Sequence, residues 1–162
     1  MDLNVVVECI MQSDGDRRLP RATEPAYLND NVVDNVQMFN GSTLIEYNLL
    51  VNGPTGDGSR WLAAAANSAN LYGFEPMALK MLGELLPNLV GLKVSSGGSR
   101  MGVEGANNAL GSWNPDYAAL NTLDPTIPKL LQEFETKFDA FDAWCTANGH
   151  TYTVRLAILH QG

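Results

Sequence analysis

The sequence predicts a single α+β domain of 162 residues (1–162) whose sheet contains both the first and the last strand of the chain. Three observations indicate this fold class. A long amphipathic helix is expected near 125–148, a β-rich segment follows it at 151–160, and alternating apolar residues open the chain. We expect the helix to cover one face of a mixed or antiparallel sheet.

The first expected strand covers residues 3–12, where apolar and polar residues alternate. One face would carry Leu3, Val5, Val7, Cys9 and Met11, and the other mostly the polar Asn4, Glu8 and Gln12. This pattern is typical of a strand with one buried face. The segment lacks the positive charge and cleavage pattern of a secretory signal, so we expect synthesis in the cytoplasm.

Turn residues end that strand and open an extended loop over 13–26, which contains two prolines and no periodicity. Residues 29–40 fit both a helical face and a β-branched strand, so their type stays open. A second strand is expected over 42–51, because this stretch is rich in β-forming residues and is followed by Asn-Gly-Pro.

Two short helices are expected next. The alanine-rich segment 60–73 has high helix propensity and ends at Gly73, and Pro76 opens a further helix that Pro87 stops. A third strand is expected at 89–94, and a helical turn at 115–120. The glycine-rich loop 95–114 between them is the best candidate for a functional surface, since loops of this length in compact domains commonly serve binding.

The long helix has the clearest boundaries in the sequence. Asp124 is the expected N-cap, Pro125 the first helical residue and Gly149 the stop. Its apolar stripe comprises Ile127, Leu131, Phe134, Phe138, Phe141 and Cys145. We expect the interior to centre on Val5, Val7, Phe134, Phe138, Phe141, Leu156 and Ile158, with Phe138 fully buried against the sheet.

The composition limits the classes of partner. Eighteen acidic and ten basic residues give a net charge of −8, which a phosphate backbone would repel, so no nucleic acid is expected. Hydrophobic residues make up 45% of the chain, yet no apolar run approaches the ~18 residues of a membrane span, and we expect a soluble protein without a membrane. Cys9 and Cys145 are interpreted as small buried residues in a reducing compartment.

No motif identifies a catalytic residue, a cofactor site or a metal site. The loop GPTGDGSR before a helix suits an anion, but it lacks the ending of a P-loop and is interpreted as a turn. The cysteines and the two histidines, His150 and His160, lack the spacing of zinc ligands. Glu8 and Glu46 lie within expected strands and form a weak candidate for a pair of carboxylates.

The string LPNLVGLKVSSGG at 86–98 resembles the lysine-bearing strand of the Schiff-base aldolases related to dihydrodipicolinate synthase. The resemblance implies a nucleophilic amine at Lys93 and an eight-stranded barrel. Such a barrel takes about 250 residues, which this chain does not have. The resemblance is therefore interpreted as local, and no catalytic residue is assigned from it.

We expect the chain to be a structural subunit of a larger assembly, with a bacteriophage virion as the favoured setting (a head–tail connector, tail terminator or capsid decoration protein). The absence of a catalytic motif, the two long polar or glycine-rich segments and the small acidic chain favour this function. Expected partners are copies of itself and other structural subunits. Interface anchors are expected at Leu19, Pro20, Trp61, Met101 and Trp113.

The alternative function is that of a small-molecule enzyme or ligand-binding domain. Its site would be a pocket between the sheet and the helices, because such pockets commonly hold small ligands. The loop 95–114 would then act as a lid over the ligand.

Overall fold

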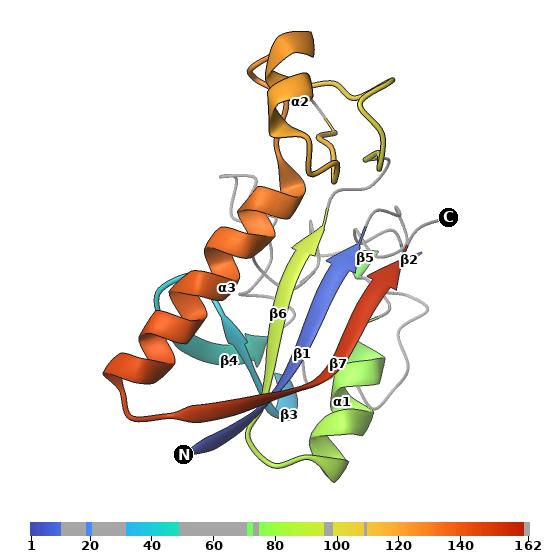
Figure 1. Cartoon of the computed structure of the whole chain (residues 1–162). Helices are drawn as coiled ribbons and strands as arrows, with labels where there is room; N and C mark the ends of the chain where they lie inside the picture. The colour runs from blue at the N-terminus through green and yellow to red at the C-terminus, as the bar shows by residue number, and fades with distance from the viewer. Residues whose placement is uncertain are drawn as a thin grey trace.

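A computed structural model gives the fold of the chain and describes residues 1–10, 19–20, 32–48, 71–72, 75–95, 99–108 and 110–160. The elements are β1 (Asp2–Ile10), β2 (Leu19–Pro20), β3 (Val32–Phe39), β4 (Leu44–Asn48), β5 (Leu71–Tyr72), α1 (Glu75–Leu85), β6 (Leu89–Ser95), α2 (Tyr117–Leu123), α3 (Leu130–Ala147) and β7 (Thr151–His160). Figure 1 shows the main sheet with α3 beside it and α2 beyond its end.

Five strands form one mixed sheet in the order β4-β3-β6-β1-β7. β1 lies parallel to both β6 and β7, β3 lies parallel to β6, and β4 runs antiparallel to β3. The first and last strands are therefore neighbours (Figure 1). The α+β fold expected from the sequence is confirmed, with the sheet of the mixed type.

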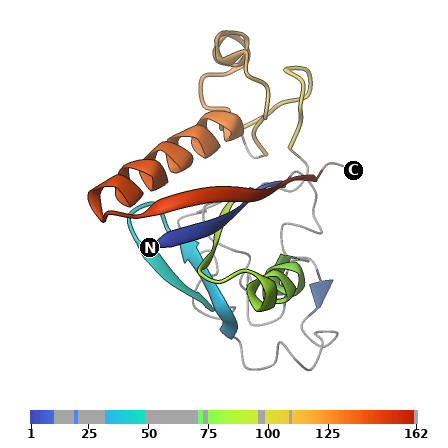
Figure 2. The same ribbon diagram turned by 60° about the horizontal axis from the view of Figure 1, so that its bottom comes forward.

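α3 and α1 cover opposite faces of this sheet, as Figure 2 shows. On the α3 side, Val5 of β1 packs in one cluster with Phe141. On the α1 side, Val6 packs with Leu79. β1 is therefore buried on both faces, and the expectation of a polar second face is wrong, since Asn4 on that face is buried too. Parallel strands covered by helices on both sides have this property.

α3 begins at Leu130, later than the sequence indicated. Asp124 follows α2 instead of capping α3, and its Oδ1 accepts hydrogen bonds from the N–H and the hydroxyl of Thr126 at 2.8 and 2.7 Å. Pro128 explains the delay, because proline lacks an N–H for a helical bond and disfavours the helical conformation of the residue before it. The expected start at Asp124 and Pro125 is therefore wrong.

The expected stop of the long helix is confirmed. Gly149 has a φ of 65°, which glycine adopts without a steric penalty. The N–H of His150 donates to the Cys145 carbonyl at 2.9 Å, and the N–H of Gly149 donates to the Thr146 carbonyl at 3.3 Å. This pair of bonds is the Schellman motif, which satisfies carbonyls at the end of the helix.

The buried stripe of α3 is rotated from the expected one. Its fully buried side chains are those of Leu130, Lys137, Phe141 and Cys145. Phe134 and Phe138 pack against the core but are only half-buried, so the expected full burial of Phe138 is wrong. Lys137 takes a central position over β6, because its Nζ donates to the main-chain carbonyl of Lys93 at 3.0 Å.

A β-bulge lies in the middle of β7. Val154 and Leu156 stand opposite consecutive residues of β1, so Arg155 is an extra residue in the register. The bulge moves the side chains after it to the other face. Ile158 is partly buried against the α1-side cluster, whereas Leu156 is exposed, so the expected place of Leu156 in the interior is wrong.

The remaining elements follow the local sequence closely. Residues 29–40, left open by the sequence, contain the strand β3. The strand expected at 42–51 is β4, the strand at 89–94 is β6 and the helix from Pro76 is α1. α2 corresponds to the expected turn at 115–120, and the Asp116 carboxylate caps it by accepting a bond from the N–H of Ala119 at 2.9 Å.

A second, two-stranded sheet joins β2 and β5 in antiparallel register. β5 occupies Leu71–Tyr72, so the alanine-rich helix expected over 60–73 does not extend to Gly73. The rest of that helix, and the loop 13–26 apart from β2, lie outside the described residues. Among the described helices, none has the length and apolar composition needed to cross a bilayer.

Candidate functional site

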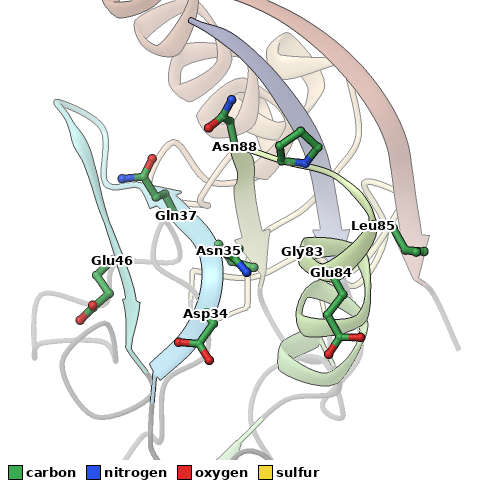
Figure 3. Close-up of a pocket in the computed structure, with 10 residues that line it drawn as sticks. Asp34, Asn35, Gln37, Glu46, Gly83, Glu84, Leu85 and Asn88 are labelled. Carbon is green, nitrogen blue, oxygen red and sulfur yellow. The ribbon is translucent and has the colours of Figure 1, made fainter.

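A groove of about 610 Å³ lies between the end of α1 and the strand pair β3–β4 (Figure 3). Its lining is polar and combines carboxylates with amides. The polar residues are Asp34, Asn35, Gln37, Glu46, Glu84 and Asn88. None of the described residues that line the groove is a lysine, arginine or histidine, so the charge of this described lining is negative.

Two lining residues have an unusual backbone conformation. Asn35, with a φ of 61°, and Asn88, with a φ of 54°, are the non-glycine residues of the described chain that have a positive φ. Asn35 lies where the register of β3 against β4 is interrupted, and Asn88 lies in the turn into β6. Its Nδ2 donates to the carbonyl of Asp2 at 3.2 Å. Asparagine adopts this left-handed backbone conformation more readily than most residues do. The two asparagines therefore fix turns of the backbone in the groove wall.

Gly83 sets how closely α1 approaches β3 at the groove. A Cβ at this position would lie 2.9 Å from Cγ2 of Val36 and 3.2 Å from the main-chain oxygen of Asp34. Such distances are too short for an unmoved neighbour, so only glycine allows this packing. The helix and strand that bound the groove are thus in direct contact at its base.

The lining of the groove offers negative charge and hydrogen-bonding amides. Its three carboxylates come from β3, β4 and α1 and are drawn apart from one another in Figure 3. Carboxylates accept hydrogen bonds and amides both accept and donate, so the lining suits a ligand with positive charge and N–H donors. No group of histidine, cysteine, aspartate and glutamate side chains in the described part of the chain is arranged to hold a metal ion.

The structure separates the two glutamates that the sequence offered as a pair. Glu8 lies in β1 and Glu46 in β4, with β3 and β6 between them. Three strand spacings of about 4.8 Å separate their Cα atoms by at least about 14 Å, and Glu46 is level with Val5, three residues before Glu8. A shared proton is excluded at this distance, so the paired-carboxylate hypothesis is wrong.

Lys93 lies in β6, and its side chain has no exposed surface. The sheet that contains it is five-stranded and open, so the resemblance to the Schiff-base aldolases does not extend to their barrel. A nucleophilic amine has to contact its substrate. The burial of Lys93 therefore gives no support to the role implied by the resemblance.

The expected interface anchors fall into different environments. Met101 is 41% exposed, whereas Trp113 is 3% exposed and donates its Nε1 hydrogen to Oγ of Ser99 at 2.9 Å. The β2 residues Leu19–Pro20 have side chains outside the described set, and Trp61 lies outside it entirely. Of the two expected anchors whose side chains are described, Met101 is exposed, and the Trp113 indole belongs to the core.

Ser112 anchors the second half of the glycine-rich loop to the start of α3. Its N–H donates to the Pro128 carbonyl at 2.9 Å, and its carbonyl accepts from the N–H of Leu130 at 2.8 Å. Its Oγ lies 3.2 and 3.0 Å from the carbonyl oxygens of Arg100 and Gly102. None of the described loop residues lines the groove, so the structure gives no support to a lid there.

The free edge of β7 is the second notable surface. β7 is the outermost strand, and no described strand pairs with its outer side. Val154, Leu156 and Leu159 on it are 42%, 41% and 65% exposed. Sequence reasoning missed this surface, because an apolar strand is ordinarily a core strand. The available signal was the uninterrupted apolar run at 156–159 in β7, which puts apolar side chains on both faces and fits either a central strand or an edge that another chain covers.

No protein-family model, curated protein or solved structure matches this chain. The polar groove and the β7 edge therefore have to indicate function by their own geometry. Of the two, the edge has the more specific chemistry. The outward N–H and C=O groups of β7, which no described strand pairs, can form main-chain hydrogen bonds in only a few ways.

Proposed function

We propose that this chain is a structural subunit of a larger protein assembly and that it contacts other chains along β7. The observation that carries the proposal is the free edge of this strand. Alternate N–H and C=O groups of an outer strand point away from the sheet, where a further strand would bond them. The exposed Val154, Leu156 and Leu159 lie along the same strand, so a partner would also bury apolar surface.

The composition of the edge supports an interface. Isolated proteins commonly protect a long edge with lysine, proline or inward-pointing charge. β7 has no lysine, proline, aspartate or glutamate, and its arginine, Arg155, is bonded through Nε to Oδ1 of Asn4 in the same chain. Its ten residues span about 33 Å, which is ample for the addition of a strand.

Exposed apolar side chains on α1 extend the contact surface on the same side of the sheet as Leu156. Met81 and Leu85 are exposed on this helix. Leu156 stands opposite Val6, which packs in the α1-side cluster, so Leu156 and Val6 lie on the face of the sheet that α1 covers. Contiguous exposed apolar side chains are typical of interaction sites.

The setting we propose is a bacteriophage virion, with copies of this chain and other structural subunits as partners. Sedimentation velocity over a wide concentration range, together with mass spectrometry of particle fractions, tests it. We expect oligomers that grow with concentration and peptides of this chain in the particles. A chain that stays monomeric and is absent from particles would overturn the proposal.

The polar groove favours ligand binding as a second candidate function. Its carboxylates, among them Asp34 and Glu84, would bind amines or guanidinium compounds. Thermal unfolding with a panel of such compounds tests this. We expect a midpoint shift in the native chain that Glu84→Gln abolishes. The matched control is Glu104→Gln, an exposed position outside the groove, which should retain the shift.

A further inference from the structure

The hydrogen bonds of β1 identify which residues of β7 have free main-chain groups. The N–H of Asn4 donates to the Asn88 carbonyl at 3.1 Å, away from β7, so the odd-numbered residues of β1 direct their groups toward β7. In a parallel pair of strands, the β7 residue opposite each odd-numbered β1 residue directs its own N–H and C=O groups away from β1. On β7 these residues are Tyr152, Val154, Ala157 and Leu159.

The bulge gives these outward groups an uneven but symmetric spacing. The steps are two residues from 152 to 154, three from 154 to 157 and two from 157 to 159. This series is the same in both directions, so it matches itself when the strand is reversed. In a regular strand the main-chain groups on one edge recur every two residues, so they would match the outward groups of only one half of β7. The partner that fits the whole edge is a strand with the same bulge at its centre.

We propose that β7 pairs antiparallel with β7 of a second copy of this chain, about a twofold axis that passes between Arg155 and Leu156. The inference rests on the proposed assembly function and names its partner. In this register Val154 stands opposite the partner's Ala157, and Tyr152 stands opposite the partner's Leu159. All ten residues of β7 are then paired.

In the same register, opposed side chains of the two copies lie on the same face of the joined sheet. Val154 and Ala157 both stand opposite β1 residues that pack on the α3 side, so the opposed side chains share one face. Arg155 stands opposite the partner's Leu156, so no like charges are opposed. β7 has no acidic residue, although the chain has a net charge of −8, so acidic side chains do not oppose each other along the edge.

The pairing satisfies the free main chain of both copies. Opposed residues whose groups point at each other exchange two hydrogen bonds, which gives about eight across the interface. The two sheets become one continuous sheet, with both copies of α3 on the same face. Val154, Leu156 and Leu159 then lie at the joint between the subunits.

Cysteine cross-linking tests the register. Val154→Cys together with Ala157→Cys puts new thiols on opposed residues, whose Cα atoms are about 5.5 Å apart, within the range of a disulfide. The matched control combines Val154→Cys with Leu159→Cys, whose closest Cα atoms across the interface are about 8 to 9 Å apart. Both variants keep the native cysteines. We expect a covalent dimer on mild oxidation of the first variant and none from the control.

Val154→Pro gives an independent measurement. The N–H of Val154 points away from β1, so proline removes no hydrogen bond within the subunit and takes a donor from the interface. We expect the native dimer mass to halve while the circular dichroism of the subunit is unchanged. Val154→Thr, which keeps the N–H, should retain the dimer.

The outcomes separate this inference from the assembly proposal. Covalent dimers from the first cysteine variant alone, with loss of the dimer in Val154→Pro, support both. An oligomer that cross-links equally in the control, or that keeps its mass in a folded Val154→Pro, overturns the twofold pairing and leaves the assembly proposal standing. If Val154→Pro does not fold, the cysteine variants decide the matter. A native chain that is monomeric and absent from particles overturns both.

Discussion

Arg155 in the bulge of β7 donates its Nε hydrogen to Oδ1 of Asn4 in β1, at 2.7 Å. Asn4 is buried, and its Nδ2 donates to the carbonyl of Pro87 at 2.6 Å. One amide therefore joins β7, β1 and the turn before β6. The bond also fixes the bulge, and with it the spacing of the free groups along the edge.

A double-mutant cycle measures this bond. Asn4→Ala should lower the free energy of unfolding by about 2 to 3 kcal/mol, because it leaves the Pro87 carbonyl and the guanidinium without their partner. Arg155→Ala should cost about 1 kcal/mol. Urea unfolding of both single variants and the double variant should give a coupling energy of about 1 kcal/mol. Strict additivity would show that the bond contributes nothing to stability.

The burial of Phe141 and Phe138 predicts unequal losses of stability. Phe141 is fully buried and meets Phe39 and Tyr152 edge-on at 5.4 and 5.2 Å between ring centroids. Phe141→Ala should therefore lower the free energy of unfolding by about 3 to 5 kcal/mol. Phe138→Ala, at a half-buried site on the same helix, should cost about half as much. Equal losses in chemical denaturation would contradict the placement of the stripe.

Three glycines should differ in their tolerance of alanine. Gly111 has a φ of 77°, and a Cβ there would lie 2.9 Å from the Pro128 oxygen. Gly149 has a φ of 65° with open space around it, and at Gly102, which has no positive φ, a Cβ would make only an ordinary contact of 3.9 Å with the Glu104 nitrogen. We expect little loss for Gly102→Ala, about 1 to 2 kcal/mol for Gly149→Ala and more for Gly111→Ala. Thermal unfolding of the three variants gives the order, and a reversed order would refute it.

Tyr117 should lose its proton at a higher pH than an ordinary tyrosine does. Burial, with a further contribution from its hydrogen bond of 3.0 Å to Oε2 of Glu135, raises the pKa of Tyr117 from 10.0 to about 12. Because the folded pKa lies above the unfolded one, the stability from this group is complete below pH 10. It is lost as the pH rises from about 10 to about 12.

Difference absorbance titration of tyrosinate, native chain against Tyr117→Phe, checks this pKa. Glu135→Gln removes the charge of the acceptor but not the burial. Its Tyr117 pKa should therefore fall and yet stay above 10. An unchanged pKa in Glu135→Gln would show that the carboxylate has no influence on the phenol.

The groove illustrates the limit of reasoning from sequence. Its lining comes from residues 34–37, Glu46, 83–85 and 87–88, which are brought together by the packing of α1 on β3 and the pairing of β3 with β4. The sequence offers Glu46 as a site residue only together with Glu8, from which two strands separate it. The left-handed backbone of Asn35 and Asn88 is compatible with asparagine, yet nothing adjacent in the sequence requires it.

Elements with local causes are predictable from the sequence. The end of the long helix at Gly149, the strand at 151–160 and the helical turn expected at 115–120 depend on residues a few positions apart, and the structure has elements at these places. The order of the strands, the burial of Lys137 in place of Phe138 and the exposure of Leu156 are not predictable in this way. They depend on contacts with residues that are distant in the sequence. A one-residue bulge opposite β1 changes the face of every later side chain in β7, and the carbonyl of Lys93 lies on a different strand from the lysine that bonds it.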